Sequence, residues 1–86
     1  MPENVRSTMG PSEQPQPALG RAIRQLREKR GVSQEALAYE AGVTSGTLSL
    51  IERGRSNPTW GTAKGIAAAL NVDIAELAKL SLEFEE

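Results

Sequence analysis

The sequence contains no cysteine and no histidine among its 86 residues. Without cysteine, the chain can form neither a disulfide nor a thiolate metal site. Without histidine, it lacks the usual general base and the commonest metal ligand. Aromatic residues are also scarce, with one each of Trp, Tyr and Phe. Because no spacing of the remaining residues suggests catalysis, we expect a protein that is not an enzyme and that holds no metal and no cofactor.

Long hydrophobic runs are absent as well. No apolar stretch approaches the roughly 20 residues that a membrane-spanning helix needs. The segment MPENVRSTMGPSEQPQP at the start offers no apolar run for a signal peptide. We therefore expect a cytoplasmic chain with no membrane partner. With 38% hydrophobic and 24% charged residues, the composition is typical of one small globular domain.

The net charge of −1 is distributed unevenly along the chain. Residues 18–66 hold eight Lys or Arg against four acidic residues, a net charge of +4. Residues 73–86 hold one Lys against five acidic residues, a net charge of −4. Such asymmetry can place a basic surface on one side of an acidic protein. Ordinary solvated helix faces explain the same distribution, so charge alone leaves both interpretations open.

Apolar residues recur at helical spacing in five segments, and no segment shows a clear strand period. The first helix begins at Pro17 and stops at Gly31, and the second is capped by Ser33 and ended by Gly42. The third and fourth cover residues 45–53 and 59–70, and Asp73 caps a short fifth. The expected core residues are Leu19, Ala22, Ile23, Leu26, Ala36, Leu37, Ala41, Leu48, Ile51, Trp60, Ala63, Ile66, Ala67, Leu70, Ile74, Leu77, Ala78 and Leu80. We expect residues 1–16 to form a disordered N-terminal arm, residues 17–81 the folded domain and residues 82–86 an acidic C-terminal tail.

The second and third helices have the pattern of a helix-turn-helix, SQEALAYEA-GVT-SGTLSLIER. Gly42 supplies a positive φ, Ala38 lets the next helix cross closely, and Val43, Leu48 and Ile51 fix the crossing angle. This geometry turns the N-terminal half of the third helix outward, as docking in a DNA major groove requires. A plain helical bundle fits the same pattern, so the pattern alone leaves DNA binding open.

A resemblance to a known family favours DNA binding. The segment IRQLREKRGVSQEALAYEAGVTSGTLSLIERGRSNP, followed by IAAALNVDIAEL, resembles the phage repressor/Cro-type (XRE) helix-turn-helix family. The resemblance implies an all-α, five-helix, lambda-repressor-like domain that binds double-stranded DNA through its third helix. It also implies a homodimer on a two-fold-related operator. We therefore expect a sequence-specific transcriptional regulator, a repressor or an operon controller.

The resemblance also assigns roles to individual positions. The base-facing positions of the family fall on Ser45, Gly46, Ser49 and Leu50. The phosphate-contacting positions fall on Gln34, Thr44, Thr47, Arg53 and Arg55. Many relatives carry Gln, Arg or Lys at the base-facing positions, whereas the side chains here select weakly among bases. DNA shape and arginine contacts are therefore expected to supply much of the selectivity.

Other assignments concern structure and partners. Arg27 and Glu52 match a family ion pair that links the first and third helices. Apolar residues near the C-terminus exceed what a five-helix core needs, so we expect a dimer surface formed by Leu77, Leu80, Leu82 and Phe84. In the competing interpretation, Leu77 and Leu80 cap the monomer core while the tail frays.

Two further features bear on partners. We expect Trp60 to pack in the core rather than to stack on a ligand. Gly61, Gly65 and Ala68 form a smooth stripe that either admits a partner or is ordinary surface. The alternative function is an antitoxin or protein-interaction module of the same fold, with a toxin or another protein as partner and little direct operator readout.

Overall fold

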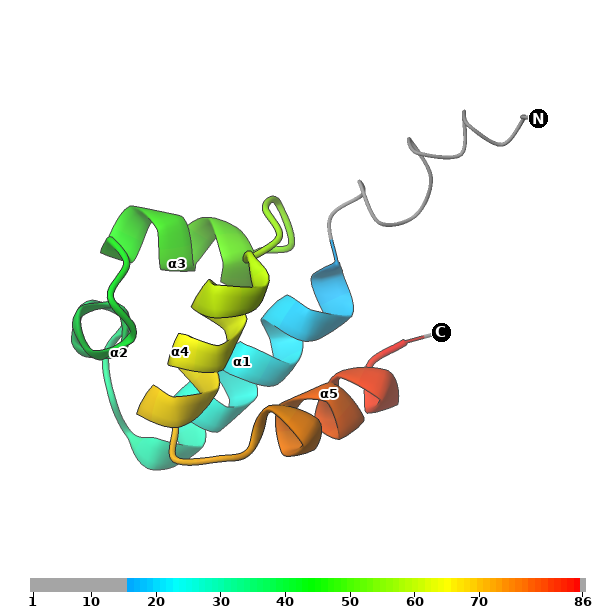
Figure 1. Cartoon of the computed structure of the whole chain (residues 1–86). Helices are drawn as coiled ribbons and strands as arrows, with labels where there is room; N and C mark the ends of the chain where they lie inside the picture. The colour runs from blue at the N-terminus through cyan, green and yellow to red at the C-terminus, as the bar shows by residue number, and fades with distance from the viewer. Residues whose placement is uncertain (1–15, 86) are drawn as a thin grey trace.

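Five helices make up the computed structural model, which describes residues 16–85 (Figure 1). The helices are α1 (Pro17–Arg30), α2 (Gln34–Ala41), α3 (Ser45–Glu52), α4 (Trp60–Ala69) and α5 (Ile74–Glu83). No strand occurs in this range, so the predicted all-α class is confirmed. The predicted N-terminal arm lies outside the described residues, except for Gln16. None of the five helices is long and apolar enough to cross a membrane.

Local capping signals explain most helix boundaries. The side-chain oxygens of Ser33, Thr44 and Thr59 accept hydrogen bonds from backbone N–H groups in the first turns of α2, α3 and α4. The Glu76 carboxylate accepts from the Asp73 N–H at 2.9 Å and begins α5.

Four predicted boundaries need correction. Arg53 is the C-cap of α3 rather than part of it. Helix α4 excludes both of its predicted ends, because Thr59 is its N-cap and Leu70 its C-cap. Helix α5 continues to Glu83, so the predicted domain limit at residue 81 cuts through a helix. The segment 82–86 is therefore not a separate tail, because its first two residues belong to α5.

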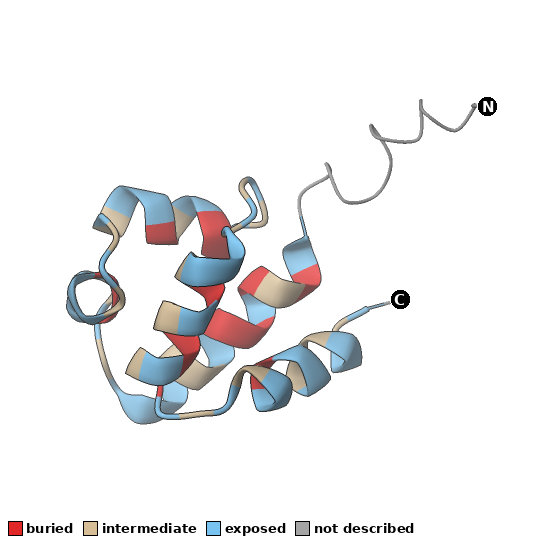
Figure 2. Ribbon diagram, viewed as in Figure 1, coloured by how far each residue is buried: buried red, intermediate tan, exposed pale blue. Residues whose placement is uncertain are grey.

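The core lies between the inner faces of all five helices, as the buried positions in Figure 2 show. Helix α1 packs against α3 and α5, and α4 packs against α2 and α5. The buried apolar cluster consists of Ala22, Ile23, Leu37, Ala38, Leu48, Ile51, Ile66, Ala67, Leu70 and Leu77. Most of the predicted core is therefore confirmed.

Three predicted core residues are wrong. Ala36 and Ala78 are exposed, and Trp60 has an exposed fraction of 65%. Trp60 is the first residue of α4, and burial on that helix begins only one turn later, at Ala63. The indole therefore extends past the core, and the Lys64 ammonium lies 5.8 Å from its ring centroid.

Two glycines mark close approaches between helices. A Cβ at Gly20 would overlap the Ile51 carbonyl oxygen and would lie 2.8 Å from that of Glu52, so α1 touches the backbone at the end of α3. A Cβ at Gly65 would lie 3.0 Å from the Ala41 carbonyl oxygen. Gly65 therefore faces α2, and the predicted smooth stripe on the outside of α4 is wrong at this position.

Candidate nucleic-acid interface

The turn between α2 and α3 has the geometry that the helix-turn-helix pattern predicts. Gly42 has a φ of 81°, in the left-handed region that favours glycine. The Val43 N–H donates to the Ala38 carbonyl at 2.9 Å and closes the turn. Leu48 and Ile51 are buried, so they fix the inner side of α3 against the core. The opposite side of α3 must therefore face outward.

Apart from Leu50, that outward side carries only small side chains. Gly46 and Leu50 are exposed, and Ser45 and Ser49 are half-buried. A Cβ at Gly46 would meet only the Thr44 hydroxyl, at 3.9 Å, so packing within the domain does not require glycine there. The backbone of α3 is consequently open to close approach by a large partner.

Hydroxyl groups stand at the start of α3. The Thr44 hydroxyl accepts from the Thr47 N–H at 3.0 Å and donates to the Thr47 hydroxyl oxygen at 3.0 Å. Both groups are exposed, and the Thr47 hydroxyl retains its own hydrogen for another acceptor. The N-terminus of α3 also attracts anions, because backbone N–H groups there lack partners within the helix.

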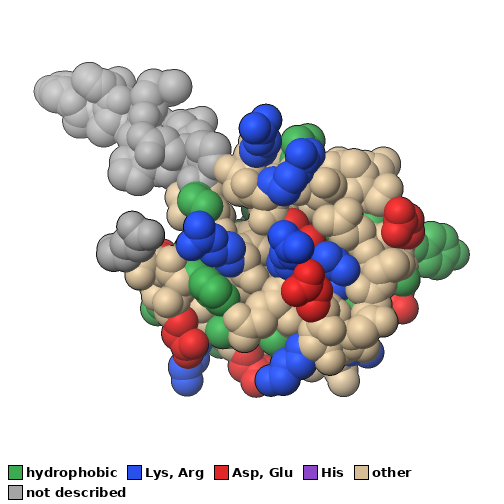
Figure 3. All heavy atoms as spheres, turned by 180° about the vertical axis from the view of Figure 1, so that it is seen from behind, with side chains coloured by type: hydrophobic (Ala, Val, Ile, Leu, Met, Phe, Trp, Pro, Cys, Tyr) green, Lys and Arg blue, Asp and Glu red, His purple; other side chains and the backbone are tan. Residues whose placement is uncertain are grey.

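Two exposed arginines, Arg53 and Arg55, follow α3. Within residues 16–85 neither forms an ion pair, and Arg53 Nε donates only to the Ser49 carbonyl, at 3.4 Å. The Gln16 N–H donates to Asn57 Oδ1 at 2.7 Å and ties this loop to the start of α1. Basic side chains stand at the upper edge of the face in Figure 3, the edge along which Figure 1 places α3.

A buried ionic network joins α1, α2 and α3. Glu52, with an exposed fraction of 6%, accepts from Arg27 Nε at 2.7 Å and from Arg27 Nη2 at 3.0 Å. The predicted structural pair is therefore confirmed. The hydrogen bond to Glu52 raises the pKa of Arg27 above its ordinary value. Arg27 Nη1 also donates to the Val32 carbonyl, at 2.9 Å, which fixes the guanidinium.

Gln34 belongs to the same network. Its Nε2 donates to Glu52 Oε1 at 3.0 Å, and the residue is half-buried. Sequence reasoning placed Gln34 at a phosphate position but missed its bond to Glu52. The only available signal was that both residues occupy helix ends that the helix-turn-helix geometry brings together.

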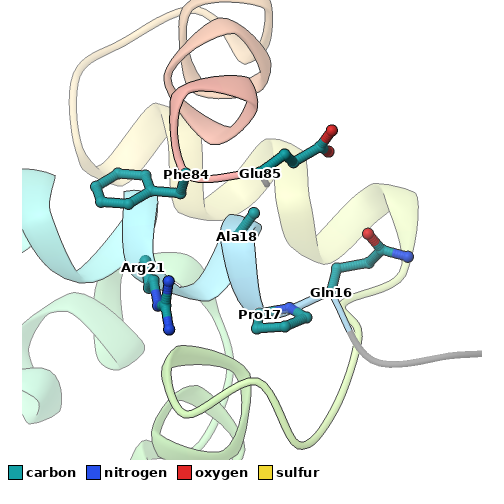
Figure 4. Close-up of a pocket in the computed structure, with 6 residues that line it drawn as sticks. All are labelled: Gln16, Pro17, Ala18, Arg21, Phe84 and Glu85. Atoms are coloured by element: carbon teal, nitrogen blue, oxygen red, sulfur yellow. The ribbon is translucent and has the colours of Figure 1, made fainter.

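The predicted dimer surface needs correction at its inner end. Leu77 is fully buried in the monomer core, and Leu80 and Phe84 are half-buried against it. Phe84 lies beside the start of α1, where it lines a hollow of about 440 Å³ together with Pro17, Ala18 and Arg21 (Figure 4). Of the four predicted residues, only Leu82 is largely exposed, with an exposed fraction of 62%.

Residues 16–85 contain no group of three or more acidic side chains that could hold a metal ion. The residues of α3 and of the loop after it can form hydrogen bonds and supply positive charge.

The exposed α3, the fixed turn before it and the basic loop after it define a helix-turn-helix DNA-binding domain. Residues 18–80 match the family model described as "Helix-turn-helix domain". The chain belongs to this helix-turn-helix family, in its XRE-like form. The family comprises DNA-binding transcriptional regulators, which are not enzymes.

Curated relatives include the HTH-type transcriptional regulator SlrR of Bacillus subtilis, 43% identical over 60 residues, covering 69% of this chain and 40% of SlrR. The regulator SutR of Escherichia coli is 44% identical over 54 residues, covering 63% of this chain and 30% of SutR. The immunity repressor protein of Bacillus phage phi105 is 32% identical over 59 residues, covering 69% of this chain and 41% of the repressor. The chain thus spans less than half the length of these relatives.

Solved structures show the same fold. The clp gene regulator ClgR of C. glutamicum superposes with a TM-score of 0.78 at 30% identity, over 83% of this chain and 92% of ClgR. The restriction-modification controller protein C.AhdI of Aeromonas hydrophila gives a TM-score of 0.69 at 33% identity, over 71% of this chain and 92% of C.AhdI.

Proposed function

We propose that the chain is a sequence-specific transcriptional regulator, a repressor or an operon controller, that binds a two-fold-related operator as a homodimer through α3. The observation that carries this proposal is the outward face of α3, which carries small side chains and Leu50 and is followed by the exposed Arg53 and Arg55. The similarity to a phage immunity repressor and to a restriction-modification controller supports it.

Base contacts come from small groups in this proposal. The hydroxyls of Ser45 and Ser49 donate to or accept from any base edge, and Leu50 touches a thymine methyl group. Such contacts select weakly, so the operator is distinguished largely by its shape and deformability. The operator should therefore tolerate base changes under α3 better than changes that stiffen the DNA.

Phosphate contacts come from residues around α3. Gln34 lies at the start of α2, Thr44 and Thr47 at the start of α3, and Arg53 and Arg55 directly after α3. Each arginine that neutralises a phosphate displaces condensed counterions, so its contribution depends on salt.

Replacing Arg53 or Arg55 with alanine should weaken binding to specific and non-specific DNA alike. The slope of log K against log salt should shrink by about one for each lost phosphate contact. Gel shifts over a salt series, with a duplex from the region upstream of the gene and a scrambled duplex, measure both effects.

Lys79→Ala is the matched control, because it removes the same charge from α5, on a helix that carries no proposed DNA contact. Its salt slope should equal that of the wild type. If all three variants keep the salt slope of the wild type, neither arginine contacts a DNA phosphate. Absence of any binding to the upstream duplex at low salt would count against the proposed function itself.

The homodimer is proposed because one recognition helix contacts only a short stretch of DNA. A single α3 contacts too few base pairs to specify one genomic site, whereas two copies read half-sites about 34 Å apart. Leu82 is a large hydrophobic residue exposed on α5, and the acidic residues Glu83 and Glu85 beside it would keep this end away from phosphate. The dimer surface is therefore proposed around Leu82, with contributions from the half-buried Leu80 and Phe84.

Leu82→Asp should give a folded monomer with much weaker operator binding, because it places a charge in the proposed contact. Sedimentation velocity measures the oligomeric state, and circular dichroism checks the fold. Ala68→Asp adds the same charge on the exposed side of α4 and should leave the dimer intact. A Leu82→Asp variant that still sediments as a dimer would place the dimer surface elsewhere.

A protein-interaction role, such as that of an antitoxin, is the second candidate. The observation that favours it is the exposure of two aromatic residues, Trp60 and Tyr39, the latter with an exposed fraction of 86%. Aromatic residues are enriched in protein interfaces. Co-expression with the product of the neighbouring gene tests this role. A complex that Trp60→Ala or Tyr39→Ala disrupts would support it.

A further inference from the structure

The Glu52 carboxylate collects hydrogen bonds from two other helices. It is the last residue of α3, and its donors are Arg27 of α1 and Gln34, the first residue of α2. We propose that Glu52 is a positioning residue for DNA binding: it orients the Gln34 amide so that one N–H meets a DNA phosphate. This inference rests on the proposed function, since it assumes that α2 and α3 dock on DNA.

The chemistry of the amide makes its orientation decisive. One end of a glutamine amide is a nitrogen with two N–H donors, and the other end is a carbonyl that only accepts. A phosphate oxygen also only accepts, so a carbonyl that faces it repels it. A carboxylate accepts as well, and it therefore bonds the nitrogen end of Gln34. This bond fixes the position of Nε2 and leaves its second N–H for another acceptor.

The carboxylate is itself held firmly. Arg27 bonds both of its oxygens, and the Arg27 guanidinium is fixed in turn by the Val32 carbonyl. Glu52 is buried and Gln34 is half-buried, so water competes weakly for these bonds. The Gln34 amide therefore meets DNA already oriented, which lowers the entropic cost of the contact.

A positioning role and a purely structural role predict opposite effects for Glu52→Gln. The substitution removes a negative charge and leaves the Arg27 cation unpaired, and both changes strengthen attraction to DNA. If Glu52 serves the fold alone, DNA affinity in the folded variant therefore stays level or rises. If Glu52 orients Gln34, affinity falls, because Arg27 would take the one carbonyl oxygen of a glutamine at position 52, and the remaining N–H groups would draw the Gln34 carbonyl inward and move Nε2 from its wild-type position.

A double-mutant cycle tests the inference. Fluorescence anisotropy gives the Kd for the upstream duplex with wild type, Gln34→Ala, Glu52→Gln and the double variant, at a temperature where all are folded. We expect each single variant to bind about tenfold more weakly, the effect of one charge-assisted hydrogen bond. The double variant should bind no more weakly than either single variant. Ile51→Val, which lowers stability without touching the network, should bind as the wild type does.

Several outcomes would overturn the inference. Tighter binding by Glu52→Gln, or losses that add in the double variant, would show that Glu52 does not act through Gln34. Unchanged binding by Gln34→Ala, while Arg53→Ala weakens binding, would reject the Gln34 contact and leave the proposed function standing. If the wild type binds no DNA, both proposals fail.

A measurement on the wild type keeps the inference testable if Glu52→Gln does not fold. The two Nε2 protons of Gln34 resonate separately because rotation about the amide C–N bond is slow, and the proton bonded to the carboxylate should lie downfield of an ordinary glutamine amide proton. The other resonance should shift when the duplex is added. Side-chain amide resonances that do not move on DNA binding would contradict the proposal.

Discussion

Replacing Glu52 with alanine is expected to lower the free energy of unfolding by about 3–5 kcal/mol. The side chains of Arg27 and Glu52 are only 12% and 2% exposed, so alanine at position 52 leaves the largely buried Arg27 cation without its counter-ion. Urea denaturation followed by circular dichroism measures the change. The double variant Arg27→Met/Glu52→Leu should recover most of the loss, because it removes both buried charges and retains apolar volume.

The chain contains its own control for this prediction. Arg24 and Glu28 also form an ion pair, at 2.9 Å, but their side chains are 61% and 55% exposed. Glu28→Ala should therefore cost less than about 1 kcal/mol. If Glu52→Ala and Glu28→Ala prove equally mild, the buried network does not hold α1 to α3.

Gly20→Ala should destabilise the domain by about 3 kcal/mol or more. The added Cβ would meet the carbonyl oxygens of Ile51 and Glu52, and backbone cannot repack as a flexible side chain can. Helices α1 and α3 would have to separate, which also disturbs the network at Glu52. Thermal melts of the variant measure the loss.

Gly61→Ala separates this contact from the ordinary effect of glycine in a helix. Gly61 also lies within a helix, but a Cβ there would meet nothing within 4 Å. Alanine at position 61 should stabilise the domain by up to about 1 kcal/mol, because it favours the helix. The two substitutions thus have opposite expected signs. A stabilising Gly20→Ala would show that α1 and α3 are not in close contact.

Helix boundaries were predictable because their signals are local. Gly31 and Gly42 both adopt a positive φ at helix ends, and Ser33 caps α2 through its own side chain. The buried positions of α1 and α3 followed from helical spacing for the same reason. The resemblance to the XRE family supplied the Arg27–Glu52 pair, which spacing alone does not indicate.

The errors arose where burial depends on contacts between distant helices. Trp60 is apolar and begins a helix, but its side chain stays largely exposed and burial on α4 begins at Ala63. The sequence assigns Leu77 both to the core and to a dimer surface, because it does not show how many apolar residues a five-helix core accommodates. The sequence does not indicate that Gly20 is a contact point and places Gly65 on an outer stripe, since a glycine in a helix shows no partner until the helices are placed.

The interface residues themselves could be predicted only through the family. No side chain at the base-facing positions selects strongly among bases; these positions are Ser45, Gly46, Ser49 and Leu50. Only their location on the outward face of α3 indicates that they belong to the interface. The bond between Gln34 and Glu52 could not be predicted, because it joins two helix ends that lie eighteen positions apart in the chain.

The central claim, that α3 and its flanks contact DNA, is tested most directly by an NMR titration of the ¹⁵N-labelled protein with the upstream duplex. We predict that the largest amide shifts fall in Gln34, in residues 44–50 and in residues 53–57, and that α5 shifts little beyond changes caused by dimer formation. Saturating shifts confined to the exposed sides of α4 or α5, with α3 unchanged, would contradict the claim.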